Sequence, residues 1–277
     1  MSISRSFFDF CESSLALFKW AVFSVVHENP VNYIKREDRP RPVAILGNGP
    51  SLKEFRPEPG RDADYCMVNF APLSELFFSV KPAYHVLVDD AFFVAEQDEL
   101  VGRMQKIDWD LRLFIPYKYR KTAQQRYGSN PHIHLIPIHL TGLPDTFAFK
   151  RTAYRLFKRG RALPIAENVM IAAIYCMMNS GYRQIDLYGA DHTWISQMMV
   201  DDQNRVCMVK DHYYDAHQVE LKPLVNADGS IPTLCQELRC QAKAFGAYEM
   251  LQGYADYLGD VVIRNRTAGS YIDAFPR

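Results

Sequence analysis

The sequence lacks the features of several protein classes. Glycine and proline number only 14 and 16 among 277 residues, which excludes collagen-like and low-complexity chains. The six cysteines form no Cys-x-x-Cys pair, so neither a disulfide framework nor a zinc site is expected. Lysine plus arginine balance aspartate plus glutamate at 32 each, which leaves no net charge to attract nucleic acid. We therefore predict a globular cytoplasmic protein without a nucleic-acid partner.

A long hydrophobic run is also missing. The apolar stretch at residues 15–26 contains a charge and falls short of the roughly 20 residues that span a bilayer, and no cleavage site follows it. Leu15, Phe18, Val22 and Val25 recur at helical spacing and predict one amphipathic helix. Its apolar face could pack on the protein's own core, on a second copy of the chain in a homo-oligomer, or on a membrane surface.

Apolar runs and helical patterns alternate along the rest of the chain. Strands are predicted at residues 43–46, 65–68, 83–88, 113–115, 133–138, 185–188 and 261–264. Helices are predicted at residues 166–179 and 234–257, each followed by a glycine that can end it. This alternation indicates an α/β protein with a doubly wound, mostly parallel, Rossmann-like sheet.

The domain organisation follows from the same pattern. Residues 1–40 are predicted to form an amphipathic helix and a charged, proline-punctuated linker, and residues 41–277 a nucleotide-binding α/β domain. Within that domain, residues 191–232 lack periodicity over a length that is unusual for a simple connection. We expect them to form a lid insertion.

The strongest functional signal follows the first predicted strand. Gly47, Asn48 and Gly49 form a tight turn, and Pro50 and Ser51 are placed to open a helix. Backbone amides and a helix N-terminus at such a turn can bind a phosphate or nucleotide. The motif lacks the third glycine of the dinucleotide fingerprint and is not a Walker loop. A tight turn without a ligand remains the alternative.

Polar residues also follow other predicted strands. Asn69 and Asp89 end the second and third strands, and Gly189 and Asp191 end a later one. Because the carboxyl ends of parallel strands meet at one edge of a sheet, these residues are expected to join Asn48 in one nucleotide crevice. Asn69 and Asp89, each taken alone, fit a helix cap better.

Histidines at the same edge and in the lid are candidates for proton transfer. His192 follows Asp191, and His212 lies beside Tyr213 among further aromatic and acidic residues. Structural roles are the alternative for both. His132 and His134 share one strand face, and we expect them to be structural rather than metal ligands. Six cations at residues 150–161 could form a solvated face, a contact with anionic lipid or a phosphate clamp.

The motif Gly47-Asn48-Gly49-Pro50-Ser51-Leu52-Lys53-Glu54 resembles the opening motif of the bacterial sialyltransferases of glycosyltransferase family 42. It also resembles the wider set that includes motility-accessory-factor glycosyltransferases and hydroxymethylpterin pyrophosphokinase-like proteins. Residues 168–191 look like the family's second signature. The resemblance implies one nucleotide-binding domain with a flexible lid, which transfers a sugar from a CMP-linked donor with inversion, without a metal or other cofactor.

The resemblance extends to individual residues. Asn48 and Ser51 match the first motif, Asn69 matches an asparagine that contacts the nucleotide, and Asp89 replaces another asparagine. His212 and Tyr213 are placed like the family's lid pair, which implies a base and a phosphate-binding hydroxyl. His217 and His192 stay open as alternatives for the base.

The chain departs from the family pattern at residues 164–168. Glu167 and Asn168 stand where the sialyltransferases have a Thr-Ser-Gly opening to the helix, which argues against sialic acid as the donor sugar. Asn168 is still included among the nucleotide-binding candidates. Residues 265–270 follow the last strand and could close over the base.

The combined expectation is a glycosyltransferase of bacterial surface polysaccharide or lipopolysaccharide assembly. Its partners would be a nucleotide sugar and a saccharide or lipid-linked acceptor, with peripheral contact at the inner face of the cell membrane. Two alternatives stay open. One is a pterin-type pyrophosphokinase that uses ATP and Mg²⁺, and the other is a non-catalytic scaffold of an envelope-assembly complex.

Overall fold

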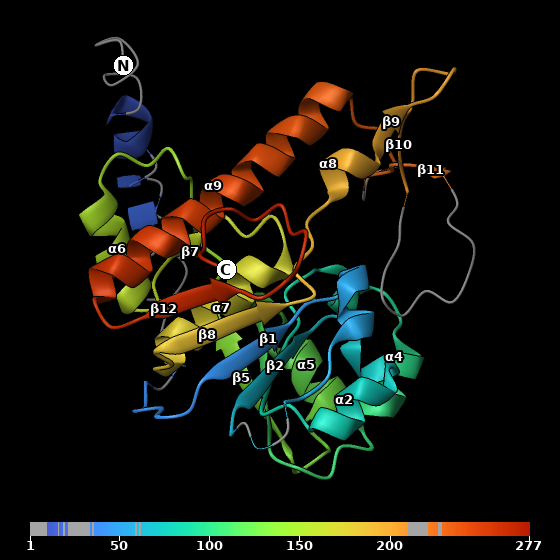
Figure 1. Ribbon diagram of the computed structural model, residues 1–277, viewed down its shortest axis with the longest axis vertical. Helices are drawn as coiled ribbons and strands as arrows, with labels where there is room; N and C mark the ends of the chain where they lie inside the picture. The colour runs from blue at the N-terminus through green and yellow to red at the C-terminus, as the bar shows by residue number, and fades with distance from the viewer. Residues whose placement is uncertain are drawn as a thin grey trace.

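The computed structural model describes residues 10–15, 17, 18, 20, 21, 34, 36–58, 60, 62–209, 221–226 and 229–277. Its core is a seven-stranded sheet in the order β12-β8-β1-β2-β3-β4-β5, in which every neighbouring pair is parallel (Figure 1). The strands are β1 (Val43–Leu46), β2 (Asp64–Val68), β3 (Tyr84–Val86), β4 (Leu111–Pro116), β5 (Ile133–Ile138), β8 (Gln184–Tyr188) and β12 (Val262–Asn265). All seven predicted strands are present, and the expected α/β fold class is confirmed.

Helices cover both faces of this sheet (Figure 1). One face packs against α6 (Lys150–Lys158), α7 (Val169–Ser180) and α9 (Leu234–Leu258). The other packs against α2 (Glu75–Val80), α4 (Asp98–Met104) and α5 (Arg120–Tyr127). Shorter connecting elements are η1 (Pro50–Glu54), η2 (Ala71–Leu73), α3 (Ala91–Val94), η3 (Tyr117–Tyr119), β6 (Gly142–Leu143) and β7 (Leu163–Pro164).

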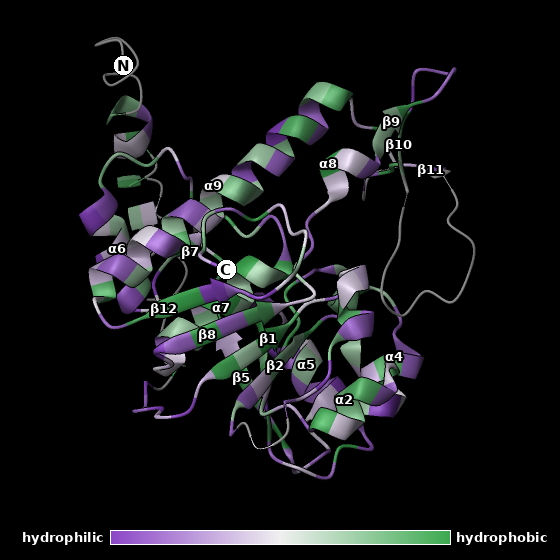
Figure 2. Cartoon of the chain, viewed as in Figure 1, coloured by the Kyte–Doolittle hydropathy of each residue, from purple (hydrophilic) through white to green (hydrophobic). Residues whose placement is uncertain are grey.

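The strands are apolar on both faces because each face is buried. Along β1, Val43 and Ile45 join the core beneath α7, whereas Ala44 and Leu46 join the core beneath α2 and α4. Figure 2 shows hydrophobic colouring of β1, whereas the edge strand β12 is hydrophobic in its first half only. A two-sided core of this kind accounts for the continuous apolar runs that marked the strands in the sequence.

The two longest helices begin and end at capping residues. α7 starts three residues later than predicted, because Asn168 is its N-cap and its Oδ1 accepts from the Met170 and Ile171 amides. It ends at Gly181, whose φ is 103°. α9 opens with a capping box between Thr233 and Gln236.

The N-terminal helical residues dock on the domain through one face only. The Ser13 hydroxyl accepts from the Ala148 amide, and the Trp20 indole donates to the Arg161 carbonyl. Leu15 and Phe18, on the predicted apolar face, are instead 53% and 66% exposed. The helix therefore packs on the core with a different face from the predicted one. Val22 and Val25 lie outside the described residues.

The predicted linker is held against the domain where it is described. Ile34 is buried, the Glu37 amide donates to the Ser180 carbonyl, and Arg39 forms a parallel bridge with Tyr182. These contacts fasten residues 36–42 beside the amino ends of the strands.

The predicted lid insertion contains a small sheet of its own. α8 (Trp194–Gln197) leads into antiparallel strands β9 (Met198–Val200), β10 (Val206–Val209) and β11 (Leu221–Pro223), in the order β11-β10-β9. His212, Tyr213 and His217 lie outside the described residues.

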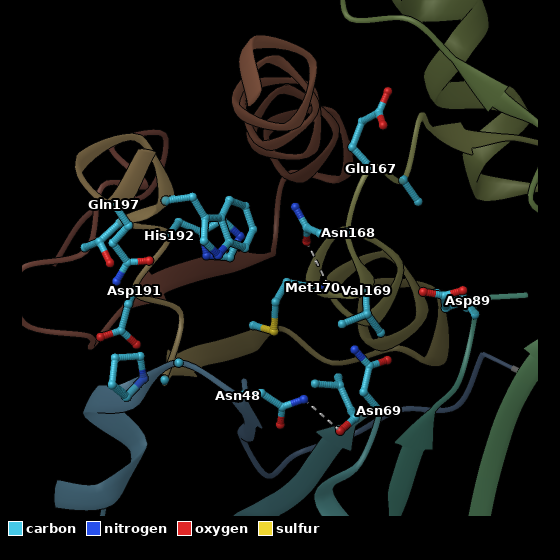
Figure 3. A pocket seen from close by; sticks show the side chains of 18 residues that line it. Asn48, Asn69, Asp89, Glu167, Asn168, Val169, Met170, Asp191, His192 and Gln197 are labelled. Atoms are coloured by element: carbon cyan, nitrogen blue, oxygen red, sulfur yellow. Dashed lines mark hydrogen bonds between the residues drawn. The ribbon is translucent and has the colours of Figure 1, made fainter. Parts of the chain in front are cut away.

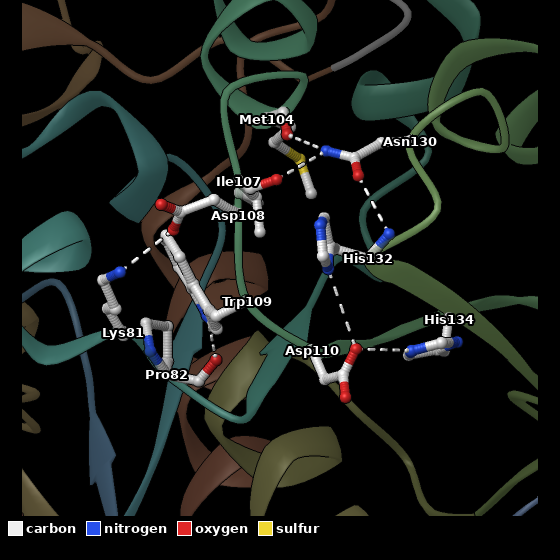
Figure 4. Close-up of polar contacts among 10 residues, drawn as sticks. All are labelled: Lys81, Pro82, Met104, Ile107, Asp108, Trp109, Asp110, Asn130, His132 and His134. Carbon is white, nitrogen blue, oxygen red and sulfur yellow. Dashed lines mark hydrogen bonds and ion pairs between the residues drawn. The ribbon is translucent and has the colours of Figure 1, made fainter.

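His132 and His134 share a carboxylate at the far side of the sheet (Figure 4). Asp110 Oδ1 lies 3.3 Å from His134 Nε2 and 3.8 Å from His132 Nδ1. The sequence did not reveal this neighbour, because Asp110 precedes β4 rather than β5. Among the described residues, no group of three or more His, Cys, Asp or Glu side chains could hold a metal ion. Within the same ranges, no helix has the length and apolarity needed to cross a membrane.

Candidate functional site

The candidate site is a cavity of about 370 Å³ at the carboxyl edge of the sheet (Figure 3). It lies where the strand order reverses, because β1 pairs with β2 on one side and with β8 on the other. Open α/β sheets bind ligands at such a switch point. The lining residues are Asn48, Gly49, Pro50, Val68, Asn69, Val88, Asp89, Ala166, Glu167, Asn168, Val169, Met170, Gly189, Asp191, His192, Thr193, Trp194 and Gln197.

The floor of the cavity is made by the close contact of two loops. The Gly47 amide donates to the Tyr188 carbonyl at 2.8 Å, and the Gly49 amide donates to the Gly189 carbonyl at 2.8 Å. A Cβ on Gly49 would lie 2.7 Å from the Gly189 oxygen and would overlap the Asp191 carboxylate. The glycines after β1 are therefore required by the loop that follows β8.

Asp191 engages the start of η1. Its Oδ2 accepts from the Ser51 hydroxyl at 2.7 Å, and its Oδ1 accepts from the Ser51 amide at 3.2 Å. From the sequence, we expected the amides at this position to bind a ligand phosphate. In the structure, the Asp191 carboxylate binds the Ser51 amide instead. Pro50 occupies the first turn of η1, as predicted.

Two asparagines that line the cavity carry buried acceptors without a partner. The Asn48 Nδ2 donates to the Val68 carbonyl, which fixes the orientation of the amide and leaves Oδ1 buried without a partner. Asn69 Oδ1 is also buried without a partner. Because a buried polar atom without a hydrogen bond is destabilising, two of them beside one cavity indicate a ligand that donates hydrogen bonds.

Asn168 offers a donor from the opposite wall. Its Oδ1 already accepts from two α7 amides and from the Tyr248 hydroxyl at 2.9 Å, so its Nδ2 is the remaining polar atom. This Nδ2 is buried and has no partner in the described structure. The residues that line the cavity therefore carry two acceptors and one donor that are buried and without a partner.

Apart from His192, the ionisable lining residues are acidic. Asp89 is exposed at the rim, and its Oδ1 caps the Ala91 amide at 2.9 Å. Glu167 accepts from the Cys240 thiol at 3.4 Å and lies 3.7 Å from the Lys243 ammonium. With Asp191 they make three carboxylates, and no lysine or arginine is among the described lining residues.

His192 closes the end of the cavity beneath α9. Burial lowers its pKa to about 3, so the ring is neutral at physiological pH. Its Nε2 lies 2.5 Å from the Tyr248 hydroxyl, and its ring centroid lies 4.3 Å from that of Trp194. A buried neutral histidine with so low a pKa is a weak general base. These contacts favour the structural alternative that its position in the sequence left open.

A second buried histidine supports Asn69 from below. His85 Nε2 lies 3.0 Å from the Asn69 carbonyl, and burial lowers the pKa of His85 to about 3. Asn69 has a φ of 51°, in the left-handed region where asparagine is tolerated better than most residues. The ring thus helps to hold a strained backbone that points an amide at the cavity.

The C-terminal segment lies behind the site rather than over it. The Thr267 hydroxyl accepts from the Ala190 amide, the Ser270 hydroxyl donates to the Ala190 carbonyl, and the Tyr271 amide donates to the Asp191 carbonyl. None of residues 265–270 is among the described lining residues. This segment therefore supports the loop after β8 and does not close over a nucleotide base as expected.

The structure brings most of the predicted residues together. Those that line the cavity are Asn48, Gly49, Pro50, Asn69, Asp89, Asn168, Gly189, Asp191 and His192. Gly47 and Ser51 lie directly behind them.

Tyr248 was not singled out from the sequence. It lies on α9, 80 residues from Asn168, and is buried on that helix together with Ala244 and Leu251. The partners of its hydroxyl depend on how α9 is rotated about its axis, and the spacing of apolar residues in the sequence does not specify that rotation.

Comparisons with protein-family models, curated proteins and solved structures gave no match for this chain. The geometry of the cavity therefore carries the functional argument.

The contact between the two loops predicts that Gly47→Ala destabilises the fold. A Cβ there would overlap the Gly189 carbonyl, and overpacking of this kind costs about 1–3 kcal/mol. The control is Gly102→Ala in α4, where a Cβ meets nothing within 4 Å and should stabilise the helix by roughly 0.5–1 kcal/mol. Urea-induced unfolding measures both variants, and equal unfolding free energies would contradict the account.

The buried histidines predict a loss of stability in mild acid. His85 and His192 have folded pKa values of about 3, below their usual value of 6.5, so the unfolded chain takes up protons that the folded chain excludes. Stability should be constant above about pH 6.5 and fall towards pH 3. Between pH 7.5 and 5.0 the loss is about 2 kcal/mol for each histidine.

Urea unfolding at the two pH values measures this loss. His85→Gln, whose amide can replace the bond to the Asn69 carbonyl, should halve it. An unfolding free energy that is the same at pH 7.5 and pH 5.0 would show that these rings are not excluded from protonation.

Proposed function

We propose that the protein is a glycosyltransferase that uses a CMP-linked sugar in the assembly of a bacterial surface polysaccharide or lipopolysaccharide. The observation that supports a nucleotide site most directly is the set of buried, unpartnered amide atoms on three residues that line one cavity: Asn48 Oδ1, Asn69 Oδ1 and Asn168 Nδ2. Nucleobases and ribose carry hydroxyl and amino donors beside ring and carbonyl acceptors. They match two acceptors and one donor better than an apolar ligand does.

The charge of the lining favours a donor with few phosphates. Asp89, Glu167 and Asp191 place three carboxylates around the cavity, and each further phosphate adds repulsion unless a cation accompanies it. A nucleoside monophosphate ester has a single anionic phosphate. This comparison supports a CMP-linked donor over a UDP-linked donor or free ATP.

Transfer of the sugar needs a base for the acceptor hydroxyl and stabilisation of the departing CMP phosphate. The resemblance to family 42 assigns these roles to His212 and Tyr213, with His217 as the alternative base, and they stay predictions from the sequence. Within the described residues, His192 is better suited to positioning, because its neutral ring is engaged by Tyr248.

Titration calorimetry with CMP, CDP, UDP and ATP tests the nucleotide assignment. We expect CMP to bind with the lowest Kd, because it brings the least phosphate charge to three carboxylates. Clear binding of another nucleotide without CMP binding would overturn the assignment. ATP binding that requires Mg²⁺ would favour the pyrophosphokinase alternative instead.

The matched variants are Asn69→Gly and Asn204→Gly. Both asparagines have positive φ values, 51° and 55°, so glycine fits both backbones without strain. Only Asn69 lines the cavity, and its loss should weaken CMP binding by about tenfold or more. Asn204→Gly should bind CMP like the unchanged protein.

The proposed site of action is the inner face of the cell membrane, supported by the N-terminal helix and α6. Phe10, Leu15 and Phe18 are more than half exposed on the helix. The helix lies along α6, because Phe10 contacts the Phe149 ring and Trp20 reaches the Arg161 carbonyl (Figure 1).

α6 and the turn after it supply the charge. The exposed cations there are Lys150, Arg151, Arg155, Lys158 and Arg159. Figure 2 shows their hydrophilic colouring beside the helix. Apolar side chains next to cations match the surface of an anionic leaflet, where each cation contributes about 1 kcal/mol.

Vesicle co-sedimentation tests this surface. The double change Leu15→Ser and Phe18→Ser should reduce binding to phosphatidylcholine vesicles with about a quarter phosphatidylglycerol, and added salt should reduce it further. Val94→Ser is the control, because Val94 is 70% exposed on α3, away from this surface. If the unchanged protein stays in the supernatant at low salt, the surface does not bind membranes.

A further inference from the structure

We infer that Tyr248 is a positioning residue for the nucleotide, because its single hydroxyl ties together two walls of the cavity. The inference rests on the proposed function and adds a residue that the family motifs do not indicate. Tyr248 does not line the cavity itself, so it acts through the residues that it holds.

The hydroxyl joins segments that are far apart in the sequence. It donates to Asn168 Oδ1 at 2.9 Å, at the N-terminus of α7, and lies 2.5 Å from His192 Nε2, in the loop between β8 and α8. Tyr248 is fully buried, and its ring also packs edge-on against His192 and Phe275. Its position on the long helix α9 is therefore fixed by packing on several sides.

The bond to Asn168 adds to those that hold its amide in one orientation. An asparagine amide can turn about its last side-chain bond and exchange its oxygen and nitrogen. Here Oδ1 accepts from the Met170 amide, the Ile171 amide and the Tyr248 hydroxyl, and a nitrogen in the same place would oppose the two backbone donors. Tyr248 adds a third hydrogen bond to the orientation that leaves Nδ2 as the unpartnered atom of the amide.

The contact with His192 holds the other wall. His192 has a φ of 52°, a left-handed conformation that is uncommon for a residue other than glycine. Its ring lies between the Tyr248 hydroxyl and Trp194, which lines the cavity. Loss of the hydroxyl would free both Asn168 and the His192 loop, so the ligand would meet a less ordered site.

Tyr248→Phe tests the inference, with Tyr254→Phe as the matched control. Tyr254 lies on the same helix, is equally buried, and donates to Asn179 Oδ1 at 2.9 Å, at the other end of α7. The two variants remove the same hydroxyl from comparable surroundings, so their thermal stabilities should fall alike. Only Tyr248→Phe should raise the Kd for CMP, by about tenfold.

A double-mutant cycle separates positioning from a general structural effect. Asn168→Asp keeps the N-cap oxygen and the acceptor for Tyr248, but it replaces the Nδ2 donor with an oxygen. It should weaken CMP binding by about tenfold, to a Kd that is still measurable, without lowering the melting temperature. In that background, adding Tyr248→Phe should change the remaining affinity by less than twofold.

The outcomes distinguish this inference from the proposed function. If the unchanged protein does not bind CMP, the proposed function fails. If it binds CMP and Tyr248→Phe binds with the same Kd as Tyr254→Phe, the nucleotide site stands and the positioning role of Tyr248 is overturned. Additive effects of Tyr248→Phe and Asn168→Asp would also overturn it.

Discussion

The contact between the loops after β1 and β8 is the constraint on which the site depends. Gly47 and Gly49 bond to the backbone of the β8 loop, and the Asp191 carboxylate then reaches Ser51 at the start of η1. This contact joins the two loops at the switch point of the sheet, where the strand order continues to β2 on one side of β1 and to β8 on the other. Asn48 is thereby held over the end of β2, with its amide fastened to the Val68 carbonyl.

The same constraint explains why polar atoms can stay unpartnered in the cavity. The side-chain amides of Asn48 and Asn168 are held by hydrogen bonds, so their free atoms cannot turn away to find other partners, and the backbone of Asn69 is held by His85. Such atoms lower the stability of the empty protein and favour a ligand that completes their hydrogen bonds. Around them the charge is negative, which limits the phosphate that the cavity can accommodate.

The sequence predicted the fold well because the relevant signals are local. Apolar runs marked every strand of the main sheet, and a polar residue at a strand end must lie at the carboxyl edge once the strands are parallel. That reasoning placed Asn48, Asn69 and Asp191 in one cavity. It could not show that Asp191 binds Ser51, because 140 residues separate them and either one could have faced a ligand.

Two further features depended on how helices are rotated. The apolar spacing of Leu15 and Phe18 predicted a face that could pack on the domain, on a second copy or on a membrane. In the structure these two side chains are exposed, and Phe10, Ser13 and Trp20 contact the domain instead. Tyr248 was not singled out from the sequence, because only tertiary packing brings its hydroxyl to Asn168. Periodicity identifies an apolar stripe, but long-range hydrogen bonds decide which face docks.

A crystal structure of the full chain with CMP would test the central claim most directly. The account predicts CMP in the cavity at the carboxyl ends of β1, β2 and β8, with Asn48 Oδ1, Asn69 Oδ1 and Asn168 Nδ2 within hydrogen-bond distance of its base or ribose. CMP bound elsewhere, or bound in this cavity while the three amides contact only water, would contradict it.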